Sequence, residues 1–284
     1  MHLIELHDRP WFPKFLRDFI TDDMETILNF VNVYGPVAPA LRNALRHAAT
    51  NRVVDLCSGG GGPWRRLWRE FDKNALAEIW LTDKYPNIAA FERTTAAAGK
   101  RICFRCDSID ALKIPGDLQG FRTIFNSFHH FAPDDARAIL QAAADSGEGI
   151  GIFETPGRDM ITLLLILLIP LADLAVAPFA RPFRWTRLLW TYLLPVIPLV
   201  LLVDGILSCL RVYSPAELSE LTRHVRPRAR EGAESGQGFE WNIGVENSGP
   251  FWVPVTYLTG YPKPVKGAIF TDNRTDEVKT AAAA

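Results

Sequence analysis

A run of small residues, Ser58-Gly59-Gly60-Gly61-Gly62, follows the apolar segment 52–57 and precedes a helical pattern that begins near Trp64. Glycines at a strand-to-helix turn let a ligand approach the backbone closely, and they leave the N–H groups of the helix start free to bind the ligand's polar end. A tight turn with a purely structural purpose uses the same residue types. Dinucleotide-binding folds also carry such a turn, so other positions must decide which ligand it holds.

Acidic residues end the next two apolar segments. Asp83 ends segment 78–83, where a carboxylate can accept hydrogen bonds from both hydroxyls of a ribose, and an NAD site needs the same acid. The G-x-G-x-x-G fingerprint of NAD-binding proteins requires a third glycine where this chain has Trp64. Asp107, followed by Ser108, ends the third segment, where a carboxylate can meet an adenine amino group. We take Asp107 as the discriminating residue.

Two histidines and a glutamate end the later segments. His129 and His130 follow segment 121–128, and Glu154 ends segment 149–154. All three are predicted at the carboxyl edge of the sheet, where α/β folds bind ligands and where an imidazole can act as a general base. Either histidine can instead pack the strand end or bind the backbone, and Glu154 can contact the acceptor or the cofactor. Tyr34, between two N-terminal helical patterns, either closes over the bound molecules or is a core aromatic.

With these residues the chain resembles the class I S-adenosylmethionine-dependent methyltransferases, over about residues 51–158 and again over 214–260. The stretch Asp55-x-x-x-Gly59-x-Gly61 is similar to the family's first motif, and Asp83 to its ribose-binding acid. Asp107-Ser108 is similar to the adenine contact, and Asn126 through His130 to the fourth motif. Cys57 departs from the family, which usually has glycine there.

The resemblance implies a cofactor, a reaction and a sheet. The cofactor is S-adenosylmethionine, no metal is implied, and the sheet has seven strands with an antiparallel last strand. Methyl transfer needs mainly an aligned acceptor, because the sulfonium is already reactive. The residues implied to bind the cofactor are Asp55, Cys57, Ser58, Gly59, Gly61, Asp83, Lys84, Asp107, Ser108 and Asn126.

The elements that must position these residues follow from the hydrophobic pattern. Residues 51–154 alternate short apolar runs with helical patterns, which predicts an α/β, Rossmann-like parallel sheet with crossover helices. Two amphipathic helices in 1–50 predict a lid, and the apolar runs near 238–246 and 251–259 predict a hairpin. We therefore expect a lid (1–50), a cofactor-binding domain (51–158 and 211–262), an apolar helical insertion (159–210) and a flexible tail (263–284).

Composition excludes several classes of protein. The chain has 31 Lys and Arg against 32 Asp and Glu, so it lacks the basic excess of a nucleic-acid binder. Its N-terminal sequence has neither the basic nor the apolar region of a signal peptide. We therefore expect a cytoplasmic protein whose four cysteines, Cys57, Cys103, Cys106 and Cys209, remain thiols.

Two apolar runs, 160–180 and 188–203, interrupt the soluble pattern directly after the fifth predicted strand. Prolines shorten any straight helix in both runs. Full spans would place Arg181, Arg184 and Arg187 across the membrane, against the positive-inside tendency, whereas a hairpin lying on one leaflet keeps them near anionic headgroups. We favour monotopic attachment to the cytoplasmic side of a membrane. A buried helical pair in a soluble cytoplasmic protein and a homodimer interface remain alternatives.

The sequence thus predicts methyl transfer from S-adenosylmethionine to a hydrophobic or lipid-like small molecule that enters beside the insertion. Direct in-line displacement, with a histidine as base where the acceptor carries a proton, accounts for the chemistry. Two alternatives stay open. One is a membrane-attached protein that binds the cofactor without turnover, and the other is an NAD-dependent enzyme.

Overall fold

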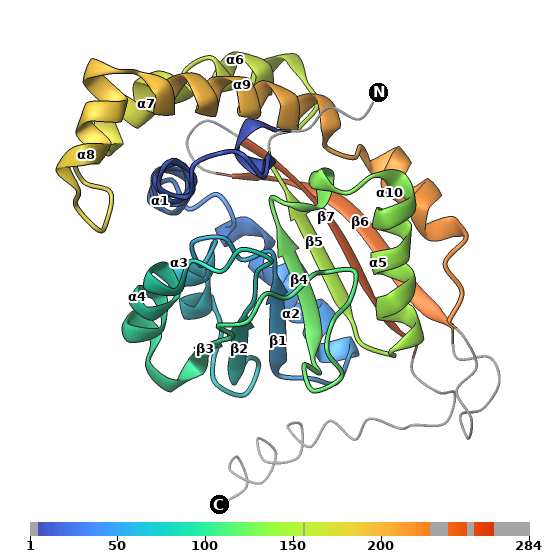
Figure 1. The fold of residues 1–284 in the computed structure, drawn as a ribbon. Coiled ribbons are helices and arrows are strands. Elements are labelled where there is room, and N and C mark those ends of the chain that lie inside the picture. Colours follow the sequence, from blue (N-terminus) through green and yellow to red (C-terminus); the bar gives the residue numbers. More distant parts are fainter. Residues whose placement is uncertain (1–4, 156, 228–237, 249–252, 264–284) are drawn as a thin grey trace, which may run out of the picture.

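A seven-stranded sheet forms the centre of the molecule in a computed structural model that describes residues 5–155, 157–227, 238–248 and 253–263. The strand order is β3-β2-β1-β4-β5-β7-β6 (Figure 1). The strands are β1 (Arg52–Leu56), β2 (Glu78–Leu81), β3 (Ile102–Phe104), β4 (Phe121–Phe125), β5 (Ile150–Glu154), β6 (Phe239–Ser248) and β7 (Val253–Pro262). β1 to β5 are parallel, and β7 runs antiparallel to both of its neighbours. The predicted fold class and the antiparallel last strand are therefore confirmed.

Neighbouring residues of β1 enter two different cores. Val53 packs in a cluster with α2 (Ala38–His47), α3 (Trp64–Leu67) and α4 (Ile88–Ala98), whereas Val54 packs with α5 (Pro133–Asp145) and α10 (Pro215–Arg223). Since successive side chains of a strand point to opposite faces, helices cover both faces of the sheet. The chain order reverses between β1 and β4, and in open α/β sheets ligands bind at the carboxyl ends beside such a point.

A third and smaller core lies above this carboxyl edge. There the N-terminal segment, η1 (Leu6–Asp8) and α1 (Lys14–Phe30), packs against α9 (Val196–Arg211) of the insertion (Figure 1). Its buried side chains are Phe12, Leu16, Phe19, Ile20, Ile197, Val200 and Leu201. The N-terminal helices thus lie between the sheet and the insertion, and the insertion's packing depends on them.

The insertion consists of short helices. They are α6 (Met160–Ile166), α7 (Ile169–Val176), α8 (Trp185–Leu188), a π-helical segment (Leu189–Leu193) and α9. Within the described ranges no single helix is long and apolar enough to cross a membrane. The pair Trp185–Leu193 and Val196–Arg211, bent by 71°, reaches the necessary length and composition together.

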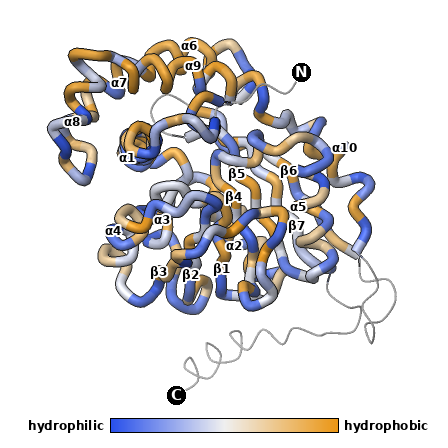
Figure 2. Tube along the Cα trace, viewed as in Figure 1, coloured by the Kyte–Doolittle hydropathy of each residue, from blue (hydrophilic) through white to orange (hydrophobic). Residues whose placement is uncertain are grey.

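Large apolar side chains are exposed along the insertion, and Figure 2 shows hydrophobic residues along α6, α7 and α9. The most exposed are Met160, Ile161, Leu171, Phe179, Trp185 and Leu193, and Trp11 and Phe15 of the N-terminal region are exposed as well. The four cysteines all lie in the described ranges, and none of them forms a disulfide there. Of the predicted tail, residues 264–284 lie outside the described part of the chain.

Candidate functional site

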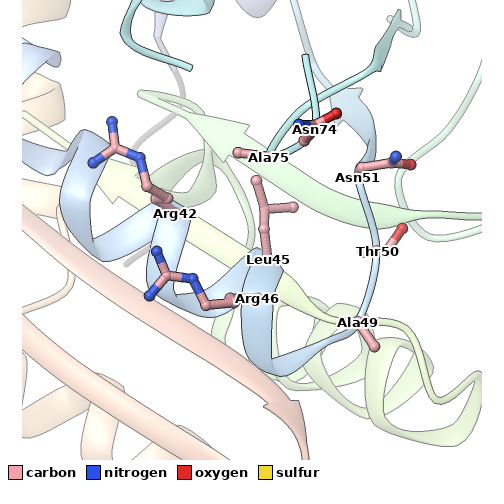
Figure 3. A pocket seen from close by; sticks show the side chains of 8 residues that line it. All are labelled: Arg42, Leu45, Arg46, Ala49, Thr50, Asn51, Asn74 and Ala75. Carbon is pink, nitrogen blue, oxygen red and sulfur yellow. The ribbon is translucent and has the colours of Figure 1, made fainter. Parts of the chain in front are cut away.

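A cavity of about 920 Å³ lies between the carboxyl edge of the sheet, α1 and the insertion. One side is polar and holds the glycine turn, Asp83 to Tyr85, Asn126, Ser127, His129 and His130. The other side is formed by apolar residues of the insertion, namely Leu165, Ile166, Leu168, Ile169 and Leu171. A second pocket of about 400 Å³ lies between α2 and the residues before β1 and β2 (Figure 3). No predicted site residue lines that second pocket, so the larger cavity is the candidate site.

Left-handed backbone conformations shape the glycine turn. Gly59, Gly61 and Gly62 have φ values of 54°, 109° and 54°, and Cys57 has 56°. A Cβ atom at Gly61 would lie 2.5 Å from Oγ1 of Thr94, so only glycine fits that position. The family's usual glycine at the position of Cys57 has the same explanation, since a residue with a Cβ adopts this φ at a steric cost. Cys57 therefore adopts a backbone conformation that glycine adopts without this cost.

Asp55 and Asp83 hold this turn in place. Asp55 is buried, and its carboxylate accepts hydrogen bonds from the hydroxyls of Ser58 (2.7 Å) and Thr123 (2.6 Å). Burial raises the pKa of Asp55 to about 6 against these hydrogen bonds. Asp83 accepts from the backbone N–H groups of Gly59 and Tyr85, both at 2.7 Å, and it lines the cavity. Asp55 therefore only positions the turn. Asp83 both positions the turn and faces the cavity, where a ligand can contact it.

Asp107 and Ser108, the predicted adenine contact, do not line the cavity. Asp107 is exposed and forms an ion pair with Arg105, whose Nε lies 2.8 Å from a carboxylate oxygen. The hydroxyl of Ser108 donates to the carbonyl of Lys84 at 2.7 Å. Of the predicted cofactor residues, the structure brings together Cys57, Ser58, Gly59, Asp83, Lys84 and Asn126 in the wall. Asp55, Gly61, Asp107 and Ser108 lie outside it.

Glu154 organises the turn that carries the two histidines. Its Oε1 accepts from the backbone N–H groups of Ser127 (2.9 Å) and Phe128 (2.8 Å), and its Oε2 binds Nδ1 of His129. Glu154 is buried and does not line the cavity, so its contacts position His129. Burial alone would lower the pKa of His129, but Glu154 and Glu5 outweigh it and raise the pKa to about 10. At neutral pH this imidazole is already protonated and cannot accept a proton, whereas the half-buried His130 faces the cavity.

Three residues of the site were missed by the sequence reasoning. Oε1 of Glu5 lies 3.2 Å from Nε2 of His129, and its Oε2 lies 3.6 Å from Nε2 of His130. Burial opposes ionisation of Glu5, yet the neighbouring histidines hold its pKa well below the usual range. Nδ1 of His7 lies 2.8 Å from Asp204 of α9. A lone charge in an apolar run needs a partner, so Asp204 carried a signal in the sequence, whereas Glu5 and His7 carried none.

The sheet decides the fold. Its seven strands, with β7 alone antiparallel, are the arrangement that the resemblance implied. The chain has the class I methyltransferase fold.

Comparisons with known proteins return solved structures only. No protein-family profile and no curated protein sequence matches the chain. "PigF with SAH" is 16% identical with a TM-score of 0.48, covering 90% of this chain and 63% of that one. Magnesium protoporphyrin IX methyltransferase (ChlM) from Synechocystis PCC 6803 with bound SAH is 10% identical with a TM-score of 0.45, covering 85% and 86%.

An O-methyltransferase family protein from Burkholderia thailandensis is 14% identical with a TM-score of 0.42, and the match covers 82% of this chain. This chain spans 58% of the length of that protein, and thus less than two thirds of it.

The methyltransferase fold places Tyr34 in its core. The ring of Tyr34 packs edge to face on Phe125, with centroids 5.1 Å apart, and burial raises the pKa of its hydroxyl well above 10. Tyr34 does not line the cavity. Tyr34 is therefore a core aromatic and does not close over the bound molecules.

Arg187 corrects one expectation for the insertion. Instead of facing headgroups, its side chain is fully buried, with Nη2 2.7 Å from Asp22 and Nε 3.2 Å from Asp23. It also donates to the carbonyls of Ala180 and Pro182. Arg181 and Arg184 are exposed. Arg187 thus connects the insertion to α1. Its guanidinium is bound by acidic side chains of α1 in place of water.

Proposed function

We propose that this protein transfers a methyl group from S-adenosylmethionine to a hydrophobic small molecule. One observation carries the proposal: a single cavity joins the glycine turn and Asp83 to an apolar wall contributed by the insertion. The polar end suits the adenosine and amino-acid parts of the cofactor, since glycine-turn N–H groups and a carboxylate meet there. The apolar end suits an acceptor with few polar groups.

Positioning supplies most of the proposed catalysis. The sulfonium is already reactive, so a cavity that holds the acceptor in line with the methyl group provides the required alignment. His129 is excluded as a base by its raised pKa of about 10. His130 and His7 both line the cavity. An acceptor hydroxyl would lose its proton in this part of the cavity.

Two rims of the cavity differ in polarity. Leu168, between α6 and α7, and Leu171, in the first turn of α7, line the cavity and are 53% and 62% exposed. On the opposite side Lys84 and Tyr85 line the cavity and are also exposed. We infer that the acceptor enters past the two leucines, and that the cofactor enters at the polar rim.

The exposed apolar face of the insertion is proposed to lie on the cytoplasmic surface of a membrane. Met160, Ile161 and Trp185 would enter the headgroup boundary, as an amphipathic interfacial helix does. The exposed Arg181 and Arg184 suit anionic headgroups. Attachment there would bring Leu168 and Leu171 close to the hydrocarbon part of the membrane, in which an apolar acceptor dissolves.

Cofactor binding and product formation test the reaction separately. Calorimetric titration should show binding of S-adenosylmethionine and its demethylated product, with no binding of NAD at the same concentrations. Labelled S-adenosylmethionine, mixed with protein and a lipid extract, should give a labelled product soluble in organic solvent. Binding without any labelled product across extracts would reduce the proposal to a cofactor-binding protein, and preferential NAD binding would overturn it.

A matched pair of charge substitutions tests the rim. Leu171→Glu and Leu199→Glu each add a carboxylate to the exposed apolar face, but Leu199, 56% exposed, does not line the cavity. Both variants should float less on anionic vesicles. Only Leu171→Glu should raise the KM for an apolar acceptor in detergent solution, by about tenfold, because one charge at the rim opposes entry by on the order of 1.4 kcal/mol.

Equal KM values for the two variants would remove the rim assignment. Unchanged flotation of both would remove the membrane surface. Sedimentation measurements at several protein concentrations would then show whether the same face forms a homodimer.

A further inference from the structure

Three potential metal ligands meet in the cavity between the sheet edge and the insertion. Glu5, His7 and His130 each offer one ligand atom, and these atoms lie within 4.8 Å of one another. All three line the cavity. We propose that they bind a divalent first-row transition-metal ion, with Zn²⁺ as the reference ion.

The donor set has the chemistry of such a site. Two imidazoles and one carboxylate bind Zn²⁺ or Fe²⁺ in sites that leave further positions open, whereas Mg²⁺ and Ca²⁺ prefer oxygen ligands. Oε2 of Glu5 lies 3.6 Å from Nε2 of His130. An ion about 2.1 Å from each ligand separates its ligand atoms by roughly 3–4 Å, so ligand atoms that lie within 4.8 Å of one another must approach by at most about an ångström.

Outer contacts fix two of the three ligands. The hydroxyl of Ser208 donates to Oε1 of Glu5 at 2.8 Å, which leaves Oε2 turned to the histidines. Asp204 binds Nδ1 of His7 at 2.8 Å and also accepts from the backbone N–H groups of Leu6 (2.7 Å) and His7 (3.2 Å). In metal sites such a carboxylate binds the ring nitrogen that does not contact the ion, so Nε2 is the nitrogen of His7 that is left for the ion.

The charges around the cluster favour a cation. Among the described groups joined by ion pairs within this cluster, the carboxylates of Glu5, Asp204 and Glu154 face two cations, His129 and Arg211, and Arg17 lies beside the cluster with its Nε donating to the carbonyl of His7 at 2.7 Å. Nη1 of Arg211 lies 3.9 Å from Glu5, and His129 is held between Glu5 and Glu154. With His7 and His130 neutral, as ligands must be, the ion-paired groups of the cluster carry one net negative charge. A divalent cation would change this net charge from −1 to +1, and it would be bound by both imidazoles.

The ion would narrow the acceptor class, a step that rests on the proposed function. An oxygen of the acceptor can take an open position, where the cation lowers the pKa of a hydroxyl. The hydroxyl proton leaves to water, the new C–O bond forms as the C–S bond breaks, and the sulfonium becomes a neutral thioether. The acceptor is therefore an apolar molecule that carries a hydroxyl.

Metal titration tests the site without cofactor or acceptor. Untagged protein, treated with a chelator and dialysed, is titrated calorimetrically with Zn²⁺ and followed in the visible spectrum with Co²⁺. We expect one ion per chain with a Kd of ~1 µM or tighter, visible cobalt bands, and no binding of Mg²⁺. His130→Ala and His7→Ala should weaken binding about 100-fold or more, since each removes a ligand.

Two further variants keep the test decisive. His224→Ala removes an exposed histidine of the surface and should leave the Kd unchanged. Glu5→Gln keeps the size of the side chain and removes its charge, and it should abolish the cobalt bands in protein whose thermal unfolding shows that it is folded. Absence of binding, or equal affinity in His130→Ala and wild type, would overturn the metal site.

The outcomes separate this site from the proposed function. Metal binding with no methylated product would leave the site standing and remove the reaction. Methylation of a hydroxyl acceptor at an unchanged rate after chelation would overturn the assigned role of the ion.

Discussion

The two sides of the cavity are held in place by different interactions. At the sheet edge, the carboxylates of Asp55, Asp83 and Glu154 accept hydrogen bonds from hydroxyls and backbone N–H groups of the adjacent turns. The insertion is joined to the N-terminal region by a small apolar core and by buried charges, chiefly Arg187 and Asp204. The sheet edge is therefore stabilised within its own domain, whereas the position of the insertion depends on a few side chains far apart in sequence.

This difference has an energetic consequence. Many hydrogen bonds stabilise the sheet edge, and each contributes about 0.5–1.5 kcal/mol to the free energy of unfolding. A buried ion pair responds far more strongly to loss of one partner, because the other charge stays buried without compensation. Substitutions on the insertion side should therefore reduce stability most, and substitutions at the turns should change ligand binding more than stability.

Arg187→Ala tests the insertion side and should have the largest effect. Asp22 keeps its ion pair with Arg93, but Asp23 loses the guanidinium and two buried carbonyls lose their donor, so the free energy of unfolding should fall by about 3 kcal/mol. Urea unfolding followed by circular dichroism measures this. The exposed Arg184 provides the control, and Arg184→Ala should stay within about 0.5 kcal/mol of wild type. Similar losses in both variants would contradict the unequal dependence of the two sides.

Asp83→Asn tests the sheet edge. An amide replaces one of the two carboxylate oxygens with a donor, so one bond from Gly59 or Tyr85 is lost together with the acceptor offered to a ribose. Affinity for S-adenosylmethionine should fall about 100-fold, or roughly 2.7 kcal/mol, as measured by calorimetric titration. Asp107→Asn should change it less than about threefold, because Asp107 lies outside the cavity. A larger effect at Asp107 would place the adenine beyond the cavity wall.

The fold and the polar end of the cavity were predictable because their signals are local. Apolar runs, the glycine turn and the acidic strand ends each lie within a few residues of one another in the sequence. The roles of the acidic residues were less predictable, since a strand-end carboxylate can face a ligand or accept from the next turn. Asp55 and Glu154 do the latter.

The cluster of histidines and carboxylates was not predictable in the same way. Glu5 and His129 are more than a hundred residues apart, and no pattern around Glu5 marks it. Their meeting depends on how the N-terminal segment packs under α9, which is a property of tertiary packing. The burial of Arg187 by Asp22 and Asp23 has the same origin.

The pH dependence of stability tests the junction of the two sides, where His129 lies between Glu154 and Glu5. Its pKa is raised to about 10, so the folded protein retains a proton that the unfolded chain loses near pH 6.5. This contribution is complete below about pH 6.5 and is lost as the pH rises through 10. Asp23 and Glu25, whose pKa values burial raises to about 8, lose their contributions between about pH 4 and 8.

From pH 8 to 10 the thiols of Cys103 and Cys209, whose pKa values burial raises, titrate as well as His129, so the difference between the wild type and His129→Gln isolates His129. That difference, measured by urea unfolding, should decrease by about 2 kcal/mol over this interval. The free energy of unfolding of His129→Gln should be lower at pH 8 and should fall less steeply up to pH 10. A wild-type curve that is flat between these values would mean that His129 is neutral, and His129 would again be a candidate base.

Cys57→Gly tests the turn itself and should have the smallest effect. Cys57 has a φ of 56°, and relieving a left-handed conformation gains about 1 kcal/mol, while the added freedom of glycine in the unfolded chain offsets part of this. Urea unfolding should show a net gain of about 0.5 kcal/mol. Asn126 has a similar φ of 51° at the end of β4, but asparagine tolerates this conformation better and its Oδ1 accepts from the N–H of Thr155 at 3.3 Å. Asn126→Gly should therefore lower stability, and a gain in both variants would mean that backbone conformation alone governs these two turns.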